Sequence, residues 1–190
     1  MIDDDHPVKP RKRAPKPLDS ARLDELALAY VARFSTSAAK LERYLRRKLR
    51  ERGWEGEGEP QVPGLVESYV QLGYVDDEAF ARAKTGGLLR RGYGARRVRQ
   101  ALGEAGIAED LREKVRPGEH AAREAILALA RRRRFGPFGA GPVDKALREK
   151  QIAAMLRSGH PLDSAREIVD AASIAEAERW VAEADEDMEP

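Results

Sequence analysis

The residues of this chain with the clearest chemical potential are arginines, gathered in one stretch without acids. Between Glu78 and Glu104 the sequence carries seven Arg or Lys side chains and no Asp or Glu, although the chain holds 35 basic and 33 acidic residues. A guanidinium is a planar fork that binds carboxylate or phosphate in bidentate fashion. The stretch therefore predicts a contact surface for an anionic partner. Its candidate residues are Arg90, Arg91, Tyr93, Arg96, Arg97 and Arg99.

A helix in the second half of this stretch would separate apolar from basic side chains. With a step of 100° per residue, Val98 and Leu102 share one face, Arg96 lies roughly opposite, and the other two arginines lie on the flanks. We expect the apolar face to pack into a core and the arginines to face outward. Neighbouring glycines such as Gly94 would let the backbone come close to a partner.

A second group of candidates is a run of four arginines. They are Arg131, Arg132, Arg133 and Arg134. Four consecutive positions on a helix span about 300° of arc, so at least one of them must face inward or lie past the helix end. We expect two of them to reach a partner.

Residues suited to catalysis or metal binding form no recognisable site. Asp76 and Asp77 directly precede a helical pattern, which favours an N-cap and a first-turn acid over a metal pair. His6, His120 and His160 have no companion at ligand spacing, and the chain has no cysteine. The GYG and TGG motifs lack the strand that a phosphate loop needs. We therefore expect no catalytic residue, no cofactor and no metal, and hence no enzyme.

Aromatic side chains are further candidates, because proteins that bind single strands stack bases on them. Tyr74 and Phe80 occupy positions typical of a core, and Trp54 and Trp180 are also better explained by packing. Tyr93, between two glycines and beside arginines, stays open between packing and partner contact.

The elements that must position these residues are helices. The 190 residues are 42% hydrophobic but only 6% aromatic, and Ala, Leu, Arg and Glu dominate, which are strong helix formers. No apolar run approaches the roughly 20 residues that span a bilayer, and the N-terminus lacks the apolar segment of a signal peptide. We expect an all-α, cytoplasmic protein without membrane association.

The two ends differ from the middle. Residues 1–19 combine acidic, Pro-rich and basic segments without apolar periodicity, so we expect a disordered tail. Its basic cluster, KPRKRAPK, is typical either of a solvated linker or of an electrostatic arm for nucleic acid. We expect residues 175–190 to form an acidic C-terminal tail.

An internal repeat organises the residues between the tails. Its copies are Leu45, Leu49 and Gly53; Val98, Leu102 and Gly106; and Ile152, Leu156 and Gly159. Apolar residues four apart line one helix face, and the glycine ends the helix. A helical stretch precedes and follows each copy, which predicts three-helix repeats at residues 20–75, 76–117 and 118–174. Because one such unit has little core, we expect neighbours to share apolar faces in an elongated, curved array.

Four segments of the chain carry a family resemblance: GYVDDEAFARA, GYGARRVRQALGEAGI, RRRRFGPF and KQIAAMLRSGHPLDSAREIV. Together they resemble the RecX family, the bacterial regulators of the RecA recombinase, and the resemblance covers roughly residues 22–172. It implies three tandem three-helix repeats that lie along the groove of RecA filaments on single-stranded DNA. It also implies inhibition of ATP hydrolysis, strand exchange and co-protease activity, and so a role in recombination, DNA repair and the SOS response. The sequence departs from the family pattern at residues 54–64 and 135–144.

Three hypotheses for function follow. The first is a monomeric inhibitor that binds RecA filaments, with the basic helix against acidic protein, DNA phosphate or both. The second is a protein that binds nucleic acid directly, since a local basic stripe also serves phosphate binding. The third is a helical-repeat adaptor. Tight binding to RecA on DNA with weak binding to bare DNA distinguishes the first from the second.

Overall fold

The computed structural model describes residues 16–141 and 144–186 as a succession of helices. The α-helices are α1 (Ser20–Val31), α2 (Ala38–Arg52), α3 (Val62–Gln71), α4 (Asp77–Arg90), α5 (Ala95–Glu104), α6 (Glu109–Lys114), α7 (Glu119–Arg133), α8 (Lys145–Arg157), α9 (Leu162–Asp170) and α10 (Ile174–Glu186), with the 3-10 helix η1 (Gly136–Phe138) before α8. In these two ranges the only β-type pairing is an isolated bridge between Leu18 and Trp54. The predicted all-α class is confirmed.

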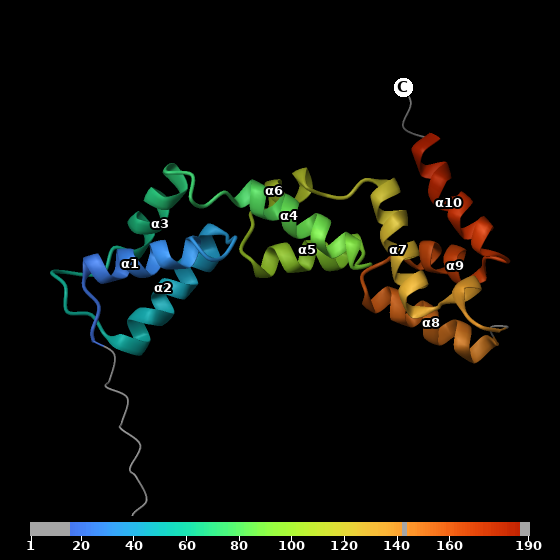
Figure 1. Cartoon of the computed structure of the whole chain (residues 1–190), viewed down its shortest axis with the longest axis horizontal. Coiled ribbons are helices and arrows are strands. Elements are labelled where there is room, and N and C mark those ends of the chain that lie inside the picture. The colour runs from blue at the N-terminus through green and yellow to red at the C-terminus, as the bar shows by residue number, and fades with distance from the viewer. Residues whose placement is uncertain (1–15, 142–143, 187–190) are drawn as a thin grey trace, which may run out of the picture.

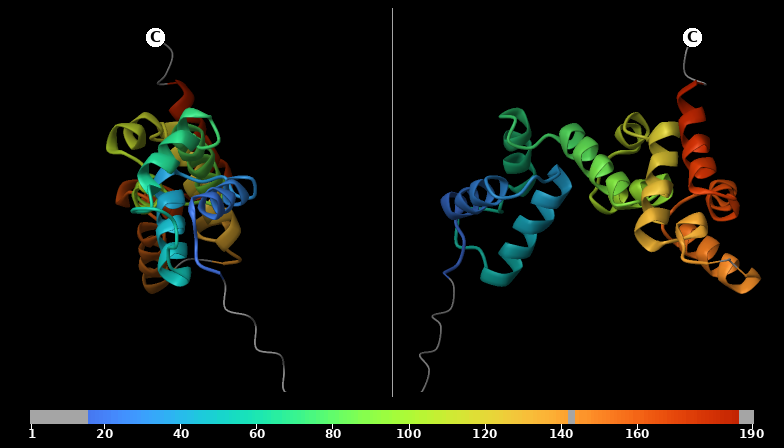
Figure 2. Two further views of the ribbon diagram at one scale, coloured as in Figure 1. Left: turned by 90° about the vertical axis from the view of Figure 1, so that its left-hand side faces the viewer. Right: turned by 45° about the vertical axis from the view of Figure 1, so that its right-hand side comes forward.

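The helices form three successive groups along one long axis (Figure 1). Helices α1–α3, α4–α6 and α7–α9 are the three groups, and α10 lies beside the last. Seen from its left-hand end the array is narrow (Figure 2). The second helices of the groups, α2, α5 and α8, follow an arch, with α5 in the middle and the other two sloping away from it. The predicted elongated and curved array of three-helix repeats is therefore confirmed.

Each of these second helices ends as the repeated sequence predicts. Gly53, Gly106 and Gly159 follow α2, α5 and α8 with φ angles of 80°, 78° and 96°. A residue with a Cβ atom enters this left-handed region only with strain, so glycine is the favoured helix stop. The spacing of apolar residues before each glycine thus gives the true C-terminal boundary of each helix.

Side chains cap the start of several helices. Asp19, Ser37, Asp76 and Asp144 accept hydrogen bonds from the first turns of α1, α2, α4 and α8. Asp76 Oδ1 accepts from the Ala79 N–H at 2.9 Å, which confirms the predicted cap. Asp77 Oδ1 accepts from the Ala38 N–H at 2.8 Å, so this first-turn acid joins the second repeat to the first.

Each repeat encloses its own cluster of buried apolar side chains. Leu41 and Leu45 are fully buried in the first cluster, Leu102 belongs to the second, and Ile126 and Ile168 belong to the third. The structure differs here from the expectation that neighbours share apolar faces. The repeats are separately packed because each brings enough leucine, isoleucine and valine to cover its own helices, and helix ends make much of the contact between repeats.

The predicted C-terminal boundary is wrong, because the chain continues as helix α10 as far as Glu186. Ala177, Val181 and Ala184 are buried, and the first two belong to the cluster of the third repeat. Their spacing of four and three residues places them on one helix face. The acidic side chains between them gave the segment the composition of a tail. Residues 187–190 of the predicted tail lie outside the described residues.

The predicted N-terminal boundary also needs correction. Leu18 is fully buried, and its N–H donates to the Gly53 carbonyl at 3.0 Å. Its own carbonyl accepts from the Glu55 N–H at 2.8 Å. The first repeat therefore begins before Asp19, which caps α1. Residues 1–15 of the predicted tail lie outside the described residues.

Candidate partner-binding surface

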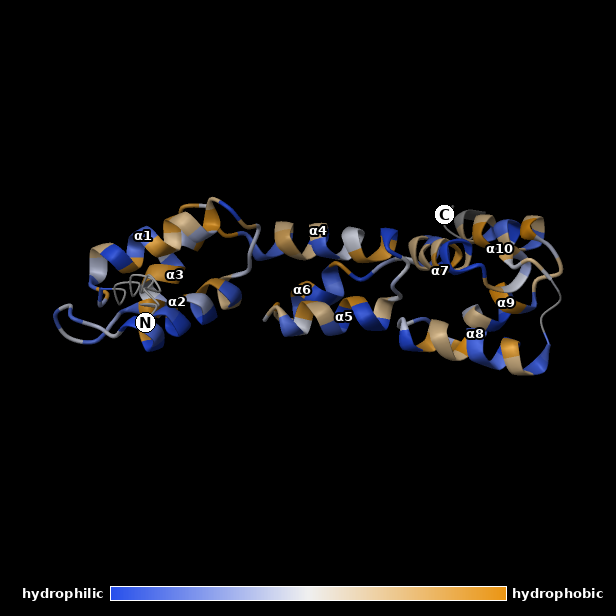
Figure 3. Ribbon diagram, turned by 60° about the horizontal axis from the view of Figure 1, so that its bottom comes forward, coloured by the Kyte–Doolittle hydropathy of each residue, from blue (hydrophilic) through white to orange (hydrophobic). Residues whose placement is uncertain are grey.

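The charge of this chain is sorted by helix position within the repeat. By sequence, α2, α5 and α8 carry fourteen basic and four acidic residues, whereas the other seven α-helices carry twelve basic and eighteen acidic residues. Figure 3 shows α2, α5 and α8 in one row along the same side of the array. We call this row of three helices the basic edge.

The basic edge is continuous across the junction between the first and second repeats. The Ser37 hydroxyl, at the start of α2, donates to the Ala105 carbonyl at the end of α5 at 2.6 Å. Arg43 donates to the Glu104 carbonyl at 2.8 Å. The C-terminal end of a helix carries a partial negative charge, so a guanidinium is stabilised there.

The junction between the second and third repeats has the same construction. The Gly94 N–H, at the start of α5, donates to the Ser158 carbonyl at the end of α8 at 2.9 Å. Arg96 donates to the Leu156 carbonyl. At each junction, then, an arginine of one middle helix binds a carbonyl at the end of the next. Arg96, predicted to face a partner, keeps an exposed side chain but has this internal role.

The glycines beside Tyr93 serve the same junction. A Cβ atom on Gly92 would lie 2.9 Å from the Leu129 Cα of α7, and one on Gly94 would meet the Gly159 carbonyl. The close backbone approach that the sequence predicts is therefore made to the third repeat of the same chain.

The remaining arginines of α5 divide into paired and available groups. Arg99 forms ion pairs with Glu109 and Glu113 of α6, so acids from a neighbouring helix enter the region that is acid-free in sequence. Arg97 is half-buried and donates to the Gln100 side chain at 2.8 Å, without an acidic partner in the described part of the chain.

The candidates before α5 lie at the end of α4. Arg91 donates to the Gly87 carbonyl at 2.9 Å, and its guanidinium carbon lies 6.0 Å from the centre of the Tyr93 ring. Tyr93 is half-buried against the cluster of the second repeat, which favours a packing role. Arg90 is exposed and lines a groove of about 910 Å³ between α4, α7 and α10.

The four consecutive arginines at the end of α7 are all exposed. Arg131 pairs with Glu178 of α10 and lies 5.9 Å from the Phe138 ring centre. Arg134 lies past the helix end with a φ of 56°, as the arc of four residues requires. Arg132, Arg133 and Arg134 have no acidic partner among residues 16–141 and 144–186, which leaves three of the four available.

A groove against α2 is the feature that the sequence analysis missed. It has a volume of about 440 Å³ and we call it the α2 groove. Its lining residues are Tyr30, Lys40, Arg43, Tyr44, Arg46, Arg47 and Arg50. The segment was missed because it contains Glu42 and Glu51, so it is not free of acids in sequence. The spacing of Lys40, Arg43, Arg47 and Arg50, however, is that of one helix face and could have revealed it.

Within residues 16–141 and 144–186, no group of three or more metal-ligand side chains occurs, and no helix is long and apolar enough to cross a membrane. His160 is 4% exposed, and its Nε2 lies 3.0 Å from the Gly92 carbonyl oxygen. Burial lowers the pKa of His160 below its ordinary value of 6.5. This side chain belongs to the junction between the second and third repeats.

Fold and surface together define a class: a helical-repeat protein with a continuous basic edge. Residues 76–115 match the family model described as RecX, second three-helix domain. The chain is 32% identical over 173 residues to Regulatory protein RecX of Myxococcus xanthus, a match that covers 86% of this chain and 90% of the relative. It is 37% identical over 132 residues to Regulatory protein RecX of Deinococcus radiodurans, covering 66% and 59%. The chain belongs to the RecX family, as its sequence motifs predicted.

The fold is also similar to that of a solved structure. The crystal structure of RecX from Lactobacillus salivarius matches with a TM-score of 0.61 at 16% sequence identity, covering 79% of this chain and 94% of that one. The array of helical repeats is thus shared at low sequence identity.

Proposed function

We propose that this chain is a non-enzymatic regulator of RecA that binds RecA filaments on single-stranded DNA and inhibits them. Its relatives are named regulatory proteins, and the RecX resemblance implies RecA as the regulated protein. Acting as a monomer in the cytoplasm, it would modulate recombination, DNA repair and the SOS response through the filament.

The observation that carries this proposal is the basic edge. Fourteen basic residues on three helices joined end to end present charge along a line rather than around a pocket. A nucleoprotein filament is a linear target whose DNA phosphates and acidic side chains recur at intervals. Arginine suits both kinds of anion because its guanidinium binds each in bidentate fashion.

Inhibition by such a surface requires no catalytic residue. A ligand that binds one conformation of an assembly more tightly than another shifts the population toward the first. An elongated protein that binds several filament subunits at once would hold them in one arrangement. ATP hydrolysis and strand exchange, which need the filament to change, would then slow.

The test is the ATPase activity of the cognate RecA on single-stranded DNA, titrated with this protein. The informative variant combines R97Q, K150Q and R157Q, which remove cations of α5 and α8. Arg96 and Arg99 are left intact because their internal partners would confound stability with binding. Each lost charge-assisted contact removes roughly 1–3 kcal/mol, so half-inhibition should need at least tenfold more protein.

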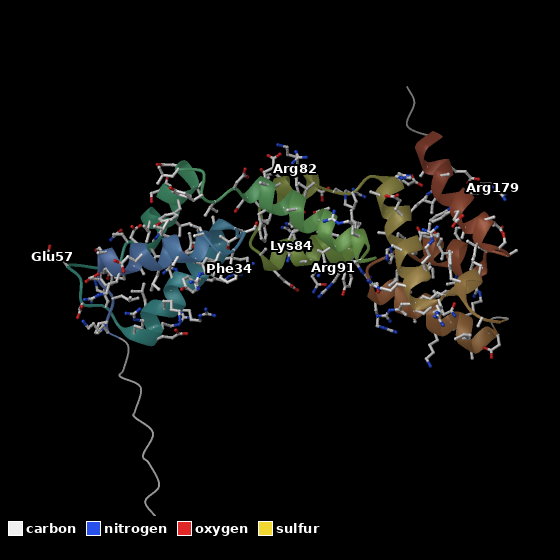
Figure 4. All side chains as sticks on the ribbon, viewed as in Figure 1. Phe34, Glu57, Arg82, Lys84, Arg91 and Arg179 are labelled. Carbon is white, nitrogen blue, oxygen red and sulfur yellow. The ribbon has the colours of Figure 1, made fainter. Side chains whose placement is uncertain are left out.

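The matched control removes three cations from helices outside the basic edge, through R82Q, R166Q and R179Q. Arg82, Arg166 and Arg179 lie on α4, α9 and α10 (Figure 4 labels the first and the last). This control should inhibit as the parent does. Equal inhibition by both folded triple variants would show that the α5 and α8 part of the basic edge is not the contact surface. No inhibition by the parent would contradict the proposed function and leave direct nucleic-acid binding and the adaptor hypothesis.

Direct binding of nucleic acid is the second candidate function. The α2 groove favours it, because the groove combines five cations with two aromatic rings. If this function alone is correct, the chain should bind bare DNA and RecA-coated DNA with similar affinity, and lower salt should strengthen both.

A further inference from the structure

Three aromatic rings form a row beside the α2 groove. Tyr30 and Tyr44 stack with ring centres 4.2 Å apart and an interplanar angle of 18°. Phe34 continues the row, with its ring centre 5.3 Å from that of Tyr30 at an angle of 50°. Phe34 is 55% exposed, so much of its side chain is accessible to a partner.

Packing against the core accounts for two of the three rings in this row. Tyr30 and Tyr44 are half-buried and pack against the cluster of the first repeat. Phe34 is not part of that cluster and leaves most of its ring in solvent. Figure 4 shows Phe34 at the end of the first repeat that lies toward the second, in the view where Lys84 and Arg91 are also visible. The row therefore runs from the core to an open face.

Two cations lie beside the Tyr44 ring. The Arg47 guanidinium carbon lies 5.6 Å and the Lys48 Nζ 5.9 Å from the centre of the Tyr44 ring. Among the described residues, no acidic side chain lines the α2 groove.

The acids nearest to the α2 groove hold its cations weakly. Arg46 pairs with Glu42 at 2.7 Å and Arg47 with Glu51 at 3.5 Å, and all four side chains are substantially exposed. Exposed ion pairs contribute little, so a phosphate can replace them readily. Arg50 is exposed and has no acidic partner in the described part of the chain.

We propose that the α2 groove binds single-stranded nucleic acid, with a base stacked on Phe34 at the exposed end of the row that Tyr30 and Tyr44 support. Arg47 and Arg50 lie on one face of α2, three residues apart, and would bind successive phosphates. A duplex keeps its bases stacked on each other, so it would gain only the phosphate contacts. An acidic peptide would use the cations but leave the aromatic row without a role.

This inference deepens the proposed function by naming the part of the chain that recognises the DNA strand. It rests on the proposed function only in taking single-stranded DNA as part of the target. The decisive measurement therefore uses this protein alone, without RecA, and variants that differ from those of the ATPase test. Failure of one proposal leaves the other intact.

The experiment measures fluorescence anisotropy of two labelled strands with equal charge. One is a 20-nucleotide thymidine strand and the other a strand of 20 abasic units, which has the phosphates without the bases. We expect the thymidine strand to bind at least fivefold more tightly, as base–aromatic stacking predicts. F34A should remove most of this preference without changing affinity for the abasic strand.

Further variants separate stacking from charge. Y44L should also reduce the preference for the thymidine strand, as F34A does. Because Tyr44 is half-buried, thermal melting must show that Y44L still folds; if Y44L does not fold, F34A alone tests the stacking. R47Q combined with R50Q should weaken both strands and reduce the slope of log affinity against log salt by about 1.4, or 0.7 per phosphate contact. Y74A, which removes a tyrosine that is 58% exposed outside the groove, should change neither strand.

Two results would overturn the inference. One is equal binding of the thymidine and abasic strands by the parent protein, or an unchanged preference in F34A. The other is displacement of the thymidine strand by polyglutamate at equal charge concentration, which would identify the α2 groove as a site for acidic peptides.

Discussion

Replacing Gly159 with alanine should loosen the junction between the second and third repeats. A Cβ atom at this position would lie 2.5 Å from the Arg97 amide nitrogen and 2.8 Å from the Arg97 Cβ. Because the amide nitrogen belongs to the backbone at the start of α5, the clash cannot be relieved by a rotamer change. Close overpacking of this kind costs roughly 1–3 kcal/mol, in addition to roughly 1–2 kcal/mol for a left-handed residue with a Cβ atom.

The chain contains its own control for the backbone strain. Gly53 has a φ of 80°, but a Cβ atom there would have no neighbour within 4 Å. G53A should therefore carry only the strain, and G159A the strain plus the clash. G106A should also carry a clash, since its Cβ atom would meet the Ala39 Cβ, which is fixed to the backbone of α2 and has no rotamer to relieve the contact.

Urea unfolding followed by circular dichroism measures these differences. We expect G159A to lose roughly 1–3 kcal/mol more than G53A, with faster hydrogen exchange at the Gly94 and Arg96 amides, whose bonds cross the junction. Equal losses of stability in G53A and G159A would refute the described contact between Gly159 and α5. If the third repeat did not pack against α5, the Cβ atom of G159A would have nothing to clash with.

Three further predictions concern burial. L102D should unfold the second repeat, since Leu102 is 1% exposed and an unpaired buried charge costs several kcal/mol; retained helicity and melting temperature would contradict this. Deleting residues 1–15 should leave the melting temperature unchanged, whereas deleting 1–19 should lower it, because Leu18 is buried and Asp19 caps α1. The lowered pKa of His160 stabilises the fold fully above pH 6.5 and progressively less as the pH falls below it, so H160Q should lose less stability than the parent between pH 7.5 and 5. Identical pH dependence of stability in H160Q and the parent would contradict this role of His160.

Local sequence patterns predicted the features that depend on contacts between neighbouring residues of the chain. The glycine at the end of each middle helix, and the Asp76 cap, follow from backbone geometry within one turn of the chain. Helix α10 was missed because its acidic residues outweigh the stripe of Ala177 and Val181 in any average over composition. A stripe of small residues becomes recognisable only with the α7 surface that it covers.

Contacts between helices decide which side chains of the candidate site are paired, and the sequence alone did not predict these contacts. Arg99 looked unpaired in sequence, yet its acids come from α6, ten residues or more away. Tyr30 and Tyr44 stack although they belong to different helices, and no periodicity within either helix indicates this. Charge and aromatic surfaces are therefore fixed by tertiary packing, which a pattern along the chain does not contain.

The end-to-end arrangement of the middle helices also sets the length over which the molecule can contact a partner. Helices α2, α5 and α8 contain 15, 10 and 13 residues, which at 1.5 Å per residue give a contour of roughly 57 Å. A compact domain of 150 residues is only about 40 Å across. A partner assembled from such domains must then present at least two of them to one molecule of this chain. Once the first is bound, the second is held at a high effective concentration, so assembled subunits are bound in preference to dispersed ones even where each single contact is weak.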